Sequence, residues 1–180
     1  IAVKKDGQLK PEYEIGIESW RRWCEKNDVE LFLLEEPVLS MDDMHIIWQR
    51  YFLFDIYDAN EIKANQTLMV DADTIIHPDC PNFWIDYWTY GNSGFQIVND
   101  SHRDFFQHMR DFYFKNIEQI NTIQQKYGIG TDQTPLNFNL KLQNVDVKLL
   151  PYKYNMGCML KKEVLADDML FTDIGWIYHF

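Results

Sequence analysis

The feature that most limits how this chain can fold is an apolar segment that ends in two aspartates. The segment TLMV, residues 67–70, is followed by Asp71, Ala72 and Asp73, and Pro78 interrupts the chain shortly afterwards. Its unbroken apolar character is typical of a strand that is buried on both faces, near the centre of a parallel sheet. In open α/β sheets ligands bind where strands end at the carboxyl edge, so a functional site is expected at these aspartates.

The rest of the chain alternates between strand and helix patterns. Strands are predicted over residues 1–5, 29–37, 67–71, 94–100 and 145–151, and helices over residues 6–28, 40–52 and 103–127. Residues 130–144 are predicted to be a loop that enters a short helix. This alternation predicts an α/β fold in three layers, an α/β/α sandwich with a mainly parallel sheet. With 180 residues, of which 46% are hydrophobic and 16% aromatic, a single domain spanning residues 1–180 is expected.

Local signals mark the ends of the predicted helices. Pro11 suits the first turn of the first helix, and Ser40 with Asp43 three residues later resembles a capping box for the second. Gly128 is placed to end the long third helix, and Pro135 lies near the first turn of the last one. These signals agree with the hydrophobic periodicity of the same segments.

The charge of the chain excludes one class of partner. The formal net charge is −11 at pH 7, and no cluster of Lys and Arg interrupts the acidic character. A protein that follows the phosphate backbone of a nucleic acid needs such a cluster, so nucleic-acid binding is not expected. An anionic ligand would need a cation to mediate its binding.

The cysteines and the hydropathy pattern indicate the cellular setting. Cys24, Cys80 and Cys158 are widely spaced and form no CxxC pair, so neither a zinc cluster nor a disulfide framework is expected. No apolar run approaches the ~20 residues that span a bilayer, and the sequence does not begin with a signal-peptide pattern. A soluble protein of the reducing cytoplasm, without a transmembrane segment, is therefore predicted.

The two aspartates have a chemistry that suits a metal ion. Asp71 and Asp73 are two residues apart, and side chains with this spacing point the same way on an extended chain. Both carboxylates can then face one cation, and hard oxygen ligands favour Mg²⁺ or Mn²⁺, which keep coordination positions for substrate phosphates. The structural alternative is that Asp73 caps the following turn while Asp71 accepts hydrogen bonds from loop amides.

Three segments together resemble a known enzyme family. MVDADTIIHP, residues 69–78, resembles the DxD motif of nucleotide-sugar-dependent glycosyltransferases of the GT-A fold. GTDQTPLNFNL, residues 130–140, resembles the D-Q-x-x-L-N segment of glycogenin-like and related retaining members. IYHF, residues 177–180, resembles the segment that supplies the late histidine of their metal site.

The order of the segments supports this resemblance. LPYKYNM, residues 150–156, is similar to the strand and loop that these enzymes place between the D-Q segment and the histidine. The matches extend from residue 68 to residue 180 in the family's order. The resemblance implies that IAVKK at the start is the first strand of the nucleotide-binding sheet, with Val3 and Lys4 at the nucleotide-sugar.

The resemblance assigns a metal centre. It implies that Mn²⁺ or Mg²⁺ is bound by Asp73, by His179 and, directly or through water, by Asp71. It also implies that Ala72, between the two aspartates, lies at the nucleotide-sugar. Such an ion bridges the diphosphate and stabilises the negative charge on the departing nucleoside diphosphate. His77 is a rival ligand, although Pro78 beside it favours a turn.

Further residues receive roles from the same resemblance. Arg50 is expected to contact phosphate or sugar, or else to be an ordinary solvated arginine of an amphipathic helix. Asp132 and Gln133 are expected beside the transferred sugar as catalytic residues, although Asp132 also suits the N-cap of a helix with an early proline. Asn99 and Asp100 follow a predicted strand and are candidates for binding sugar or acceptor hydroxyls.

The implied function is metal-dependent glycosyl transfer. A hexosyl or pentosyl group would move from a UDP-sugar, which is favoured, or a GDP-sugar to a hydroxyl of a glycan or of a protein-linked glycan. The D-Q segment favours retention of configuration, whereas an inverting enzyme would need Asp100 or Asp132 as a base. Family members usually continue past the metal histidine with a glycine-containing loop, so part of the phosphate site is expected beyond Phe180.

Two other classes remain open. A phosphatase-like, metal-dependent hydrolase of the haloacid-dehalogenase type also has two aspartates after a strand, but its D-x-D-x-T pattern requires threonine where this chain has Ile75. A non-catalytic carbohydrate-binding domain could use Trp84 and Trp88, which more often pack a helix onto a sheet. A glycoside hydrolase fits poorly, because its carboxylates stand ~5 Å or more apart on opposite sides of the sugar bond.

Overall fold

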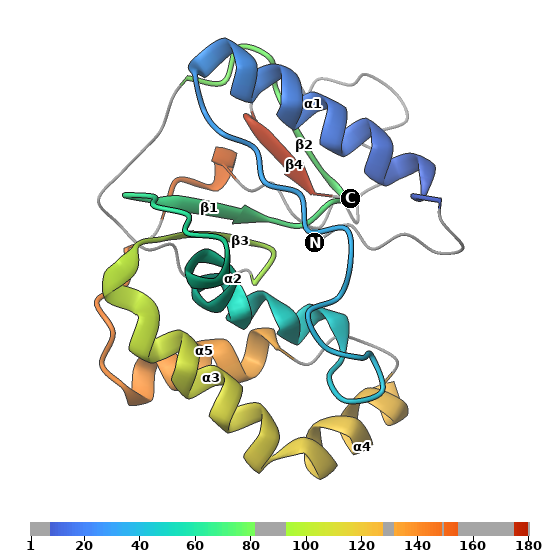
Figure 1. Cartoon of the computed structure of the whole chain (residues 1–180), viewed down its shortest axis with the longest axis vertical. Coiled ribbons are helices and arrows are strands. Elements are labelled where there is room, and N and C mark those ends of the chain that lie inside the picture. The colour runs from blue at the N-terminus through green and yellow to red at the C-terminus, as the bar shows by residue number, and fades with distance from the viewer. Residues whose placement is uncertain (1–7, 82–92, 128–131, 149, 155–174, 180) are drawn as a thin grey trace. The chain divides into compact units, whose positions relative to one another are not determined.

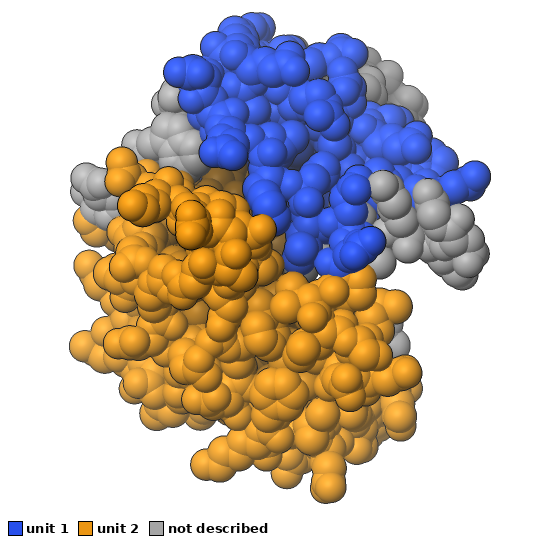
Figure 2. Space-filling view, viewed as in Figure 1, with its two compact units in different colours: residues 1–36, 70–84, 150–180 blue, residues 37–69, 85–149 orange. Residues whose placement is uncertain are grey.

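The computed structural model describes residues 8–81, 93–127, 132–148, 150–154 and 175–179. Val3, Lys4, Trp84, Trp88 and the predicted strand at residues 1–5 lie outside these ranges, as do Gly128 and Cys158. The chain divides into two compact units (Figure 2), which are described separately. Unit 1 contains residues 1–36, 70–84 and 150–180, and unit 2 contains residues 37–69 and 85–149. The expected single domain stays a prediction.

Unit 1 contains a helix packed on a short antiparallel pair of strands. Helix α1, Pro11–Asn27, packs on strand β2, Thr74–Ile76 (Figure 1). Strand β4, Ile177–His179, pairs with β2 in the antiparallel direction. A short 3₁₀ helix, Tyr152–Tyr154, contacts β4.

Helix α1 confirms the predicted first helix. Pro11 is its first residue, where the missing N–H costs nothing because the first amides of a helix have no internal partner. At the other end Asp28 has φ 54° and ψ 48°, and the Val29 amide donates to the Cys24 carbonyl at 2.9 Å. This left-handed end closes the helix as a C-terminal glycine commonly does.

Unit 2 contains most of the helices and one sheet. Strands β1, Thr67–Val70, and β3, Phe95–Val98, pair with each other, and β1 ends at the boundary of unit 1. The helices of this unit are the 3₁₀ helix η1, Ile46–Phe52, then α2, Leu53–Ala59, the 3₁₀ turn η2, Asp100–His102, and α3, Arg103–Lys115, α4, Ile117–Tyr127, and α5, Gln133–Leu142.

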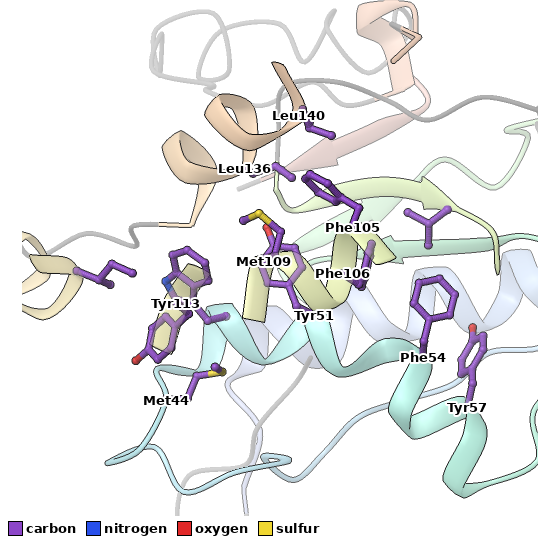
Figure 3. Packing of buried hydrophobic residues seen from close by; sticks show 13 residues of the cluster. Met44, Tyr51, Phe54, Tyr57, Phe105, Phe106, Met109, Tyr113, Leu136 and Leu140 are labelled. Carbon is purple, nitrogen blue, oxygen red and sulfur yellow. The ribbon is translucent and has the colours of Figure 1, made fainter. Parts of the chain in front are cut away.

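The core of unit 2 is rich in aromatic side chains (Figure 3). Tyr51 of η1 packs against Phe106 of α3, with ring centroids 5.5 Å apart, and Phe106 also contacts Phe54 of α2 at 5.0 Å. Leu136 and Leu140 of α5 belong to the same cluster. Burial of large apolar side chains from all these helices stabilises the unit, at about 1.5–3 kcal/mol for each fully buried side chain.

The strand predicted at residues 29–37 is wrong. Residues 29–35 belong to no helix or strand. Leu31 and Phe32 are 36% and 51% exposed, so neither of the alternate faces is buried. The apolar pattern of this segment resembles that of a strand, but the segment lacks the burial that stabilises one. The strand predicted at residues 145–151 is reduced to an isolated bridge at Lys148 among its described residues.

Two predicted helices have different limits in the structure. The segment at 40–52 begins as a turn, in which the Asp43 and Met44 amides both donate to the Ser40 carbonyl, and helical structure starts only at Ile46. The long helix at 103–127 is two helices, because Asn116 interrupts it. The Asn116 side-chain amide donates to the Phe112 carbonyl at 2.7 Å, which competes with the helical pattern.

The α/β class is confirmed in its coarser form. Helices and strands are both present, and the strands at 67–71 and 94–100 are found as β1 and β3. β3 is buried, whereas β1 is only partly buried, so the full burial expected for residues 67–70 is wrong. In the described part of the chain the strands form two separate pairs, of which β2–β4 is antiparallel. The three-layer sandwich with a mainly parallel sheet stays a prediction.

Candidate metal centre

The cluster Asp71, Asp73 and His179 lies in unit 1. One possible ligand atom from each residue lies within 4.8 Å of the others. His179 Nε2 is 3.2 Å from Asp73 Oδ1 and 3.7 Å from Asp71 Oδ2. The side chains are 18%, 32% and 33% exposed for His179, Asp73 and Asp71, so an ion from solvent can reach them. Two carboxylates and one imidazole form a donor set that suits Mn²⁺ or Mg²⁺.

A turn brings the two carboxylates together. After β1 the Thr74 amide donates to the Asp71 carbonyl at 3.2 Å, and Thr74 Oγ1 donates to the same oxygen at 2.7 Å. The sequence predicted that Asp71 and Asp73 converge because the chain is extended, and this reason is wrong. The convergence comes from a turn that Thr74 closes.

Strand pairing places the histidine. In the β2–β4 register Thr74 is opposite His179, so the residue next to Asp73 pairs directly with the histidine. The contact joins residues more than 100 positions apart in the chain and rests on a strand of three residues, Ile177–His179. The rival ligand His77 is elsewhere: its Nδ1 accepts from the Asp79 amide at 3.1 Å, and its ring packs on Trp176.

The cluster favours a charged Asp73. Burial raises the pKa of Asp73. The hydrogen bond and positive charge of His179, the residue's own amide and Lys10 together lower it by more, so that the pKa lies below the ordinary value. The carboxylate is therefore ionised at neutral pH, as a metal ligand must be.

Unit 2 brings together two other predicted site residues. Arg50 Nε of η1 lies 3.4 Å from Asp132 Oδ2, and the side chains are 11% and 6% exposed. Asp132 occupies the N-cap position of α5, yet its carboxylate makes no capping hydrogen bond to the described helix. The N-cap interpretation is thus correct for position, while the carboxylate is turned to the ion pair. Gln133, the first residue of α5, is exposed.

The remaining candidates have structural partners. Asn99 caps η2, with Oδ1 accepting from the Ser101 amide at 3.1 Å, and Asp100 Oδ1 accepts from Arg103 Nε at 2.6 Å. These bonds account for both side chains without a ligand. Their expected role in binding sugar or acceptor hydroxyls stays a prediction.

A histidine beside the ion pair predicts a pH effect on stability. His45 is the N-cap of η1, and its Nδ1 accepts from the Ile47 amide at 3.4 Å. Burial lowers the pKa of His45, and the charge of Asp132 raises it only in part. A lowered pKa gives stability that is present above the ordinary histidine pKa and is lost as the pH falls through the lowered value.

His45→Asn is therefore expected to reduce this pH dependence. Asparagine keeps an N-cap acceptor but does not titrate. Chemical unfolding of both proteins between about pH 7 and about pH 5 should show a smaller loss of unfolding free energy in the variant, by on the order of 1 kcal/mol or less. His102 also has a lowered pKa, so the difference between the two proteins is the informative quantity. Identical slopes would contradict the assignment.

Comparisons with known proteins identify the fold. No family model matches the chain, and no curated protein matches it. A solved glycosyltransferase involved in the glycosylation of the major capsid of PBCV-1 matches with a TM-score of 0.63 at 9% identity, over 98% of this chain and 90% of that one. The chain has a glycosyltransferase-like fold. The apo form of the glycosyltransferase GlyE from Streptococcus pneumoniae TIGR4 matches with a TM-score of 0.47 at 16% identity, over 96% of this chain and 44% of that one.

The fold likeness agrees with the family that the motifs resemble. At this identity it concerns the fold alone, so the metal, donor and acceptor are matters for the proposal below. In the described ranges no helix is both long enough and apolar enough to cross a membrane.

Proposed function

We propose that the protein is a metal-dependent glycosyltransferase of the GT-A type. It transfers a hexosyl or pentosyl group from a UDP-sugar, or a GDP-sugar, to a hydroxyl of a glycan or protein-linked glycan. The observation that supports this is the cluster Asp71, Asp73 and His179 in a chain with a glycosyltransferase-like fold. The two aspartates directly follow β1, and the histidine ends β4. A three-layer sandwich with a mainly parallel sheet is part of the proposal.

The cluster residues have defined tasks in this function. Asp71, Asp73 and His179 hold Mn²⁺ or Mg²⁺, which supplies the positive charge that a leaving diphosphate needs. Asp73 is ionised at neutral pH, so its carboxylate can bind the ion without releasing a proton. His179 Nε2 lies 3.2 Å from Asp73 Oδ1, so the imidazole and this carboxylate are close enough to bind one ion.

The other predicted residues are proposed to bind the donor or the transferred sugar. Val3, Lys4, Ala72, Asn99 and Asp100 are assigned to the nucleotide-sugar by the motif resemblance. In the same way, Arg50 is assigned to phosphate or sugar, and Asp132 and Gln133 are assigned to catalysis beside the transferred sugar. Retention is proposed because the D-Q segment resembles that of retaining enzymes, in which the leaving diphosphate takes the acceptor's proton. The buried thiols of Cys24 and Cys80 are consistent with a reducing compartment, the cytoplasm.

A thermal-shift experiment tests the proposal. A nucleotide-sugar at about 100 times its dissociation constant stabilises the folded protein by about 2.7 kcal/mol, which raises the melting temperature by about 5–10 °C. UDP- and GDP-sugars are compared with and without Mn²⁺, and with EDTA. The expected result is a shift only when donor and Mn²⁺ are both present. A shift of equal size in EDTA, or none with any donor, would overturn the proposal.

A further inference from the structure

A glycine in the middle of α1 lies directly against the metal-binding segment. Gly16 is buried, and a Cβ built on it would be 2.4 Å from the Ala72 carbonyl oxygen and 2.7 Å from that of Thr74. Real Cβ atoms do not approach backbone oxygens so closely, so an alanine would push the two apart. Glycine inside a helix costs about 0.5–1 kcal/mol relative to alanine. The close approach explains why glycine occupies this position.

A chain of hydrogen bonds leads from the same helix to Asp71. Trp20 Nε1 donates to Thr74 Oγ1 at 2.9 Å, and Thr74 Oγ1 donates to the Asp71 carbonyl at 2.7 Å. Trp20 is 4% exposed and Thr74 is 0% exposed. The buried hydroxyl thus accepts from the helix and donates to the turn that brings the carboxylates together. Buried polar bonds of this kind fix one geometry where apolar packing tolerates several.

Ser19 adds a contact at the far end of the segment. Its Oγ accepts from the Ile76 amide at 3.2 Å and donates to the Gly16 carbonyl at 2.7 Å. Residues 16, 19 and 20 lie on one face of a helix, because side chains three and four positions apart are neighbours. This face therefore holds residues 72–76 at three points.

We propose that Gly16, Ser19 and Trp20 are positioning residues for the metal centre. They fix the backbone of the turn and of β2, and thereby the distances among Asp71, Asp73 and His179. The inference rests on the proposed metal-dependent function and deepens it. It predicts that changes on this face of α1 weaken metal binding. The hydrogen bonds of Ser19 and Trp20 reach the segment through Ile76 and Thr74, and not through the carboxylates or the imidazole.

The first pair of variants tests the hydroxyl of Thr74, which links Trp20 to the Asp71 carbonyl. Thr74→Val keeps the shape of the side chain and removes the hydroxyl, whereas Thr74→Ser keeps the hydroxyl. Mn²⁺ affinity is measured on the full chain by the electron paramagnetic resonance signal of free Mn²⁺. Loss of a residue that orients metal ligands typically weakens binding ~10- to 100-fold. That loss is expected for Thr74→Val, and near wild-type affinity for Thr74→Ser.

A second pair separates positioning from general stability. Trp20→Phe removes the donor to Thr74, and Trp23→Phe removes a buried indole donor of the same helix that bonds the Cys80 carbonyl at 2.8 Å instead. Both variants are expected to lower the melting temperature by similar amounts. Only Trp20→Phe should lower Mn²⁺ affinity, and Ser19→Ala should lower it less.

The outcomes distinguish this inference from the proposed function. If the wild-type chain binds no Mn²⁺, the metal-dependent function fails and the inference fails with it. If the wild type binds Mn²⁺ and Thr74→Val and Trp20→Phe bind it equally well, only the inference is overturned. Equal weakening by Trp20→Phe and Trp23→Phe would also overturn it, since a loose helix would then explain both. If Trp20→Phe does not fold, Ser19→Ala decides, because it removes the other side-chain bond from α1 to β2. Unchanged Mn²⁺ affinity in Ser19→Ala would then overturn the inference.

Discussion

Asp73→Asn is expected to lower the rate of sugar transfer by on the order of 10² to 10³-fold. Asparagine has the same shape but no charge, so the metal site loses one of its two anionic ligands. The effect should appear in two measurements. Donor-dependent release of nucleoside diphosphate falls, and the Mn²⁺-dependent rise in melting temperature with a nucleotide-sugar disappears.

A matched control makes this result specific. Asp79→Asn is the same substitution in the same unit, at an exposed residue whose partner is Lys26. An exposed ion pair contributes about 0–1 kcal/mol, so this variant should keep both activity and the Mn²⁺ effect. Full activity in Asp73→Asn, with or without Mn²⁺, would contradict the assignment of Asp73 as a metal ligand.

Acid titration provides a second readout of the same substitution. Because the pKa of Asp73 is lowered in the folded chain, its contribution to stability is present above the ordinary aspartate pKa and is lost as the pH falls through the lowered value. Asp73→Asn removes that contribution. The metal-free wild type and variant should therefore differ most at neutral pH and converge in strong acid.

Elements with strong local signals could be predicted from the sequence. Helix α1 has a proline at its start, and β1 and β3 are short apolar runs bounded by polar turns. The break at Asn116 could not be predicted in the same way. The residues on both sides of it are compatible with one helix, and the side-chain bond to Phe112 is a local competitor that periodicity does not detect.

The candidate site shows where local reasoning ends. Asp71 and Asp73 attract attention because two charges follow an apolar segment. The turn that brings them together depends on a hydroxyl bonded to Trp20, 54 residues away. Only the motif resemblance indicated His179. Local pattern could not, because a strand of three residues is stable only when β2 pairs with it. Gly16 was missed, because a glycine inside a helical pattern indicates only a small loss of helix propensity.

Arg50→Met is expected to lower the unfolding free energy by about 3–5 kcal/mol, the largest effect on stability predicted here. Arg50 and Asp132 are both almost fully buried, with Nε and Oδ2 3.4 Å apart. Methionine fills similar volume but leaves the Asp132 carboxylate in the protein interior without the guanidinium. Burial then favours the neutral acid, so the variant should regain part of its stability as the pH falls from neutrality. Urea unfolding at several pH values measures both effects.

A double-mutant cycle and an exposed ion pair test the cause. Adding Asp132→Asn to Arg50→Met removes the buried charge, so the double variant should be less destabilised than the sum of the single ones, with a coupling of about 0.5–3 kcal/mol. Arg103 bonds both oxygens of Asp58 with better geometry, at 2.8 and 2.9 Å, but on the surface. Arg103→Met should leave stability nearly unchanged, because solvent screens an exposed pair and replaces its hydrogen bonds. An additive cycle would show that Arg50 stabilises unit 2 through the packing of its alkyl chain, and the charge of Asp132 would then have to be balanced by its other contacts.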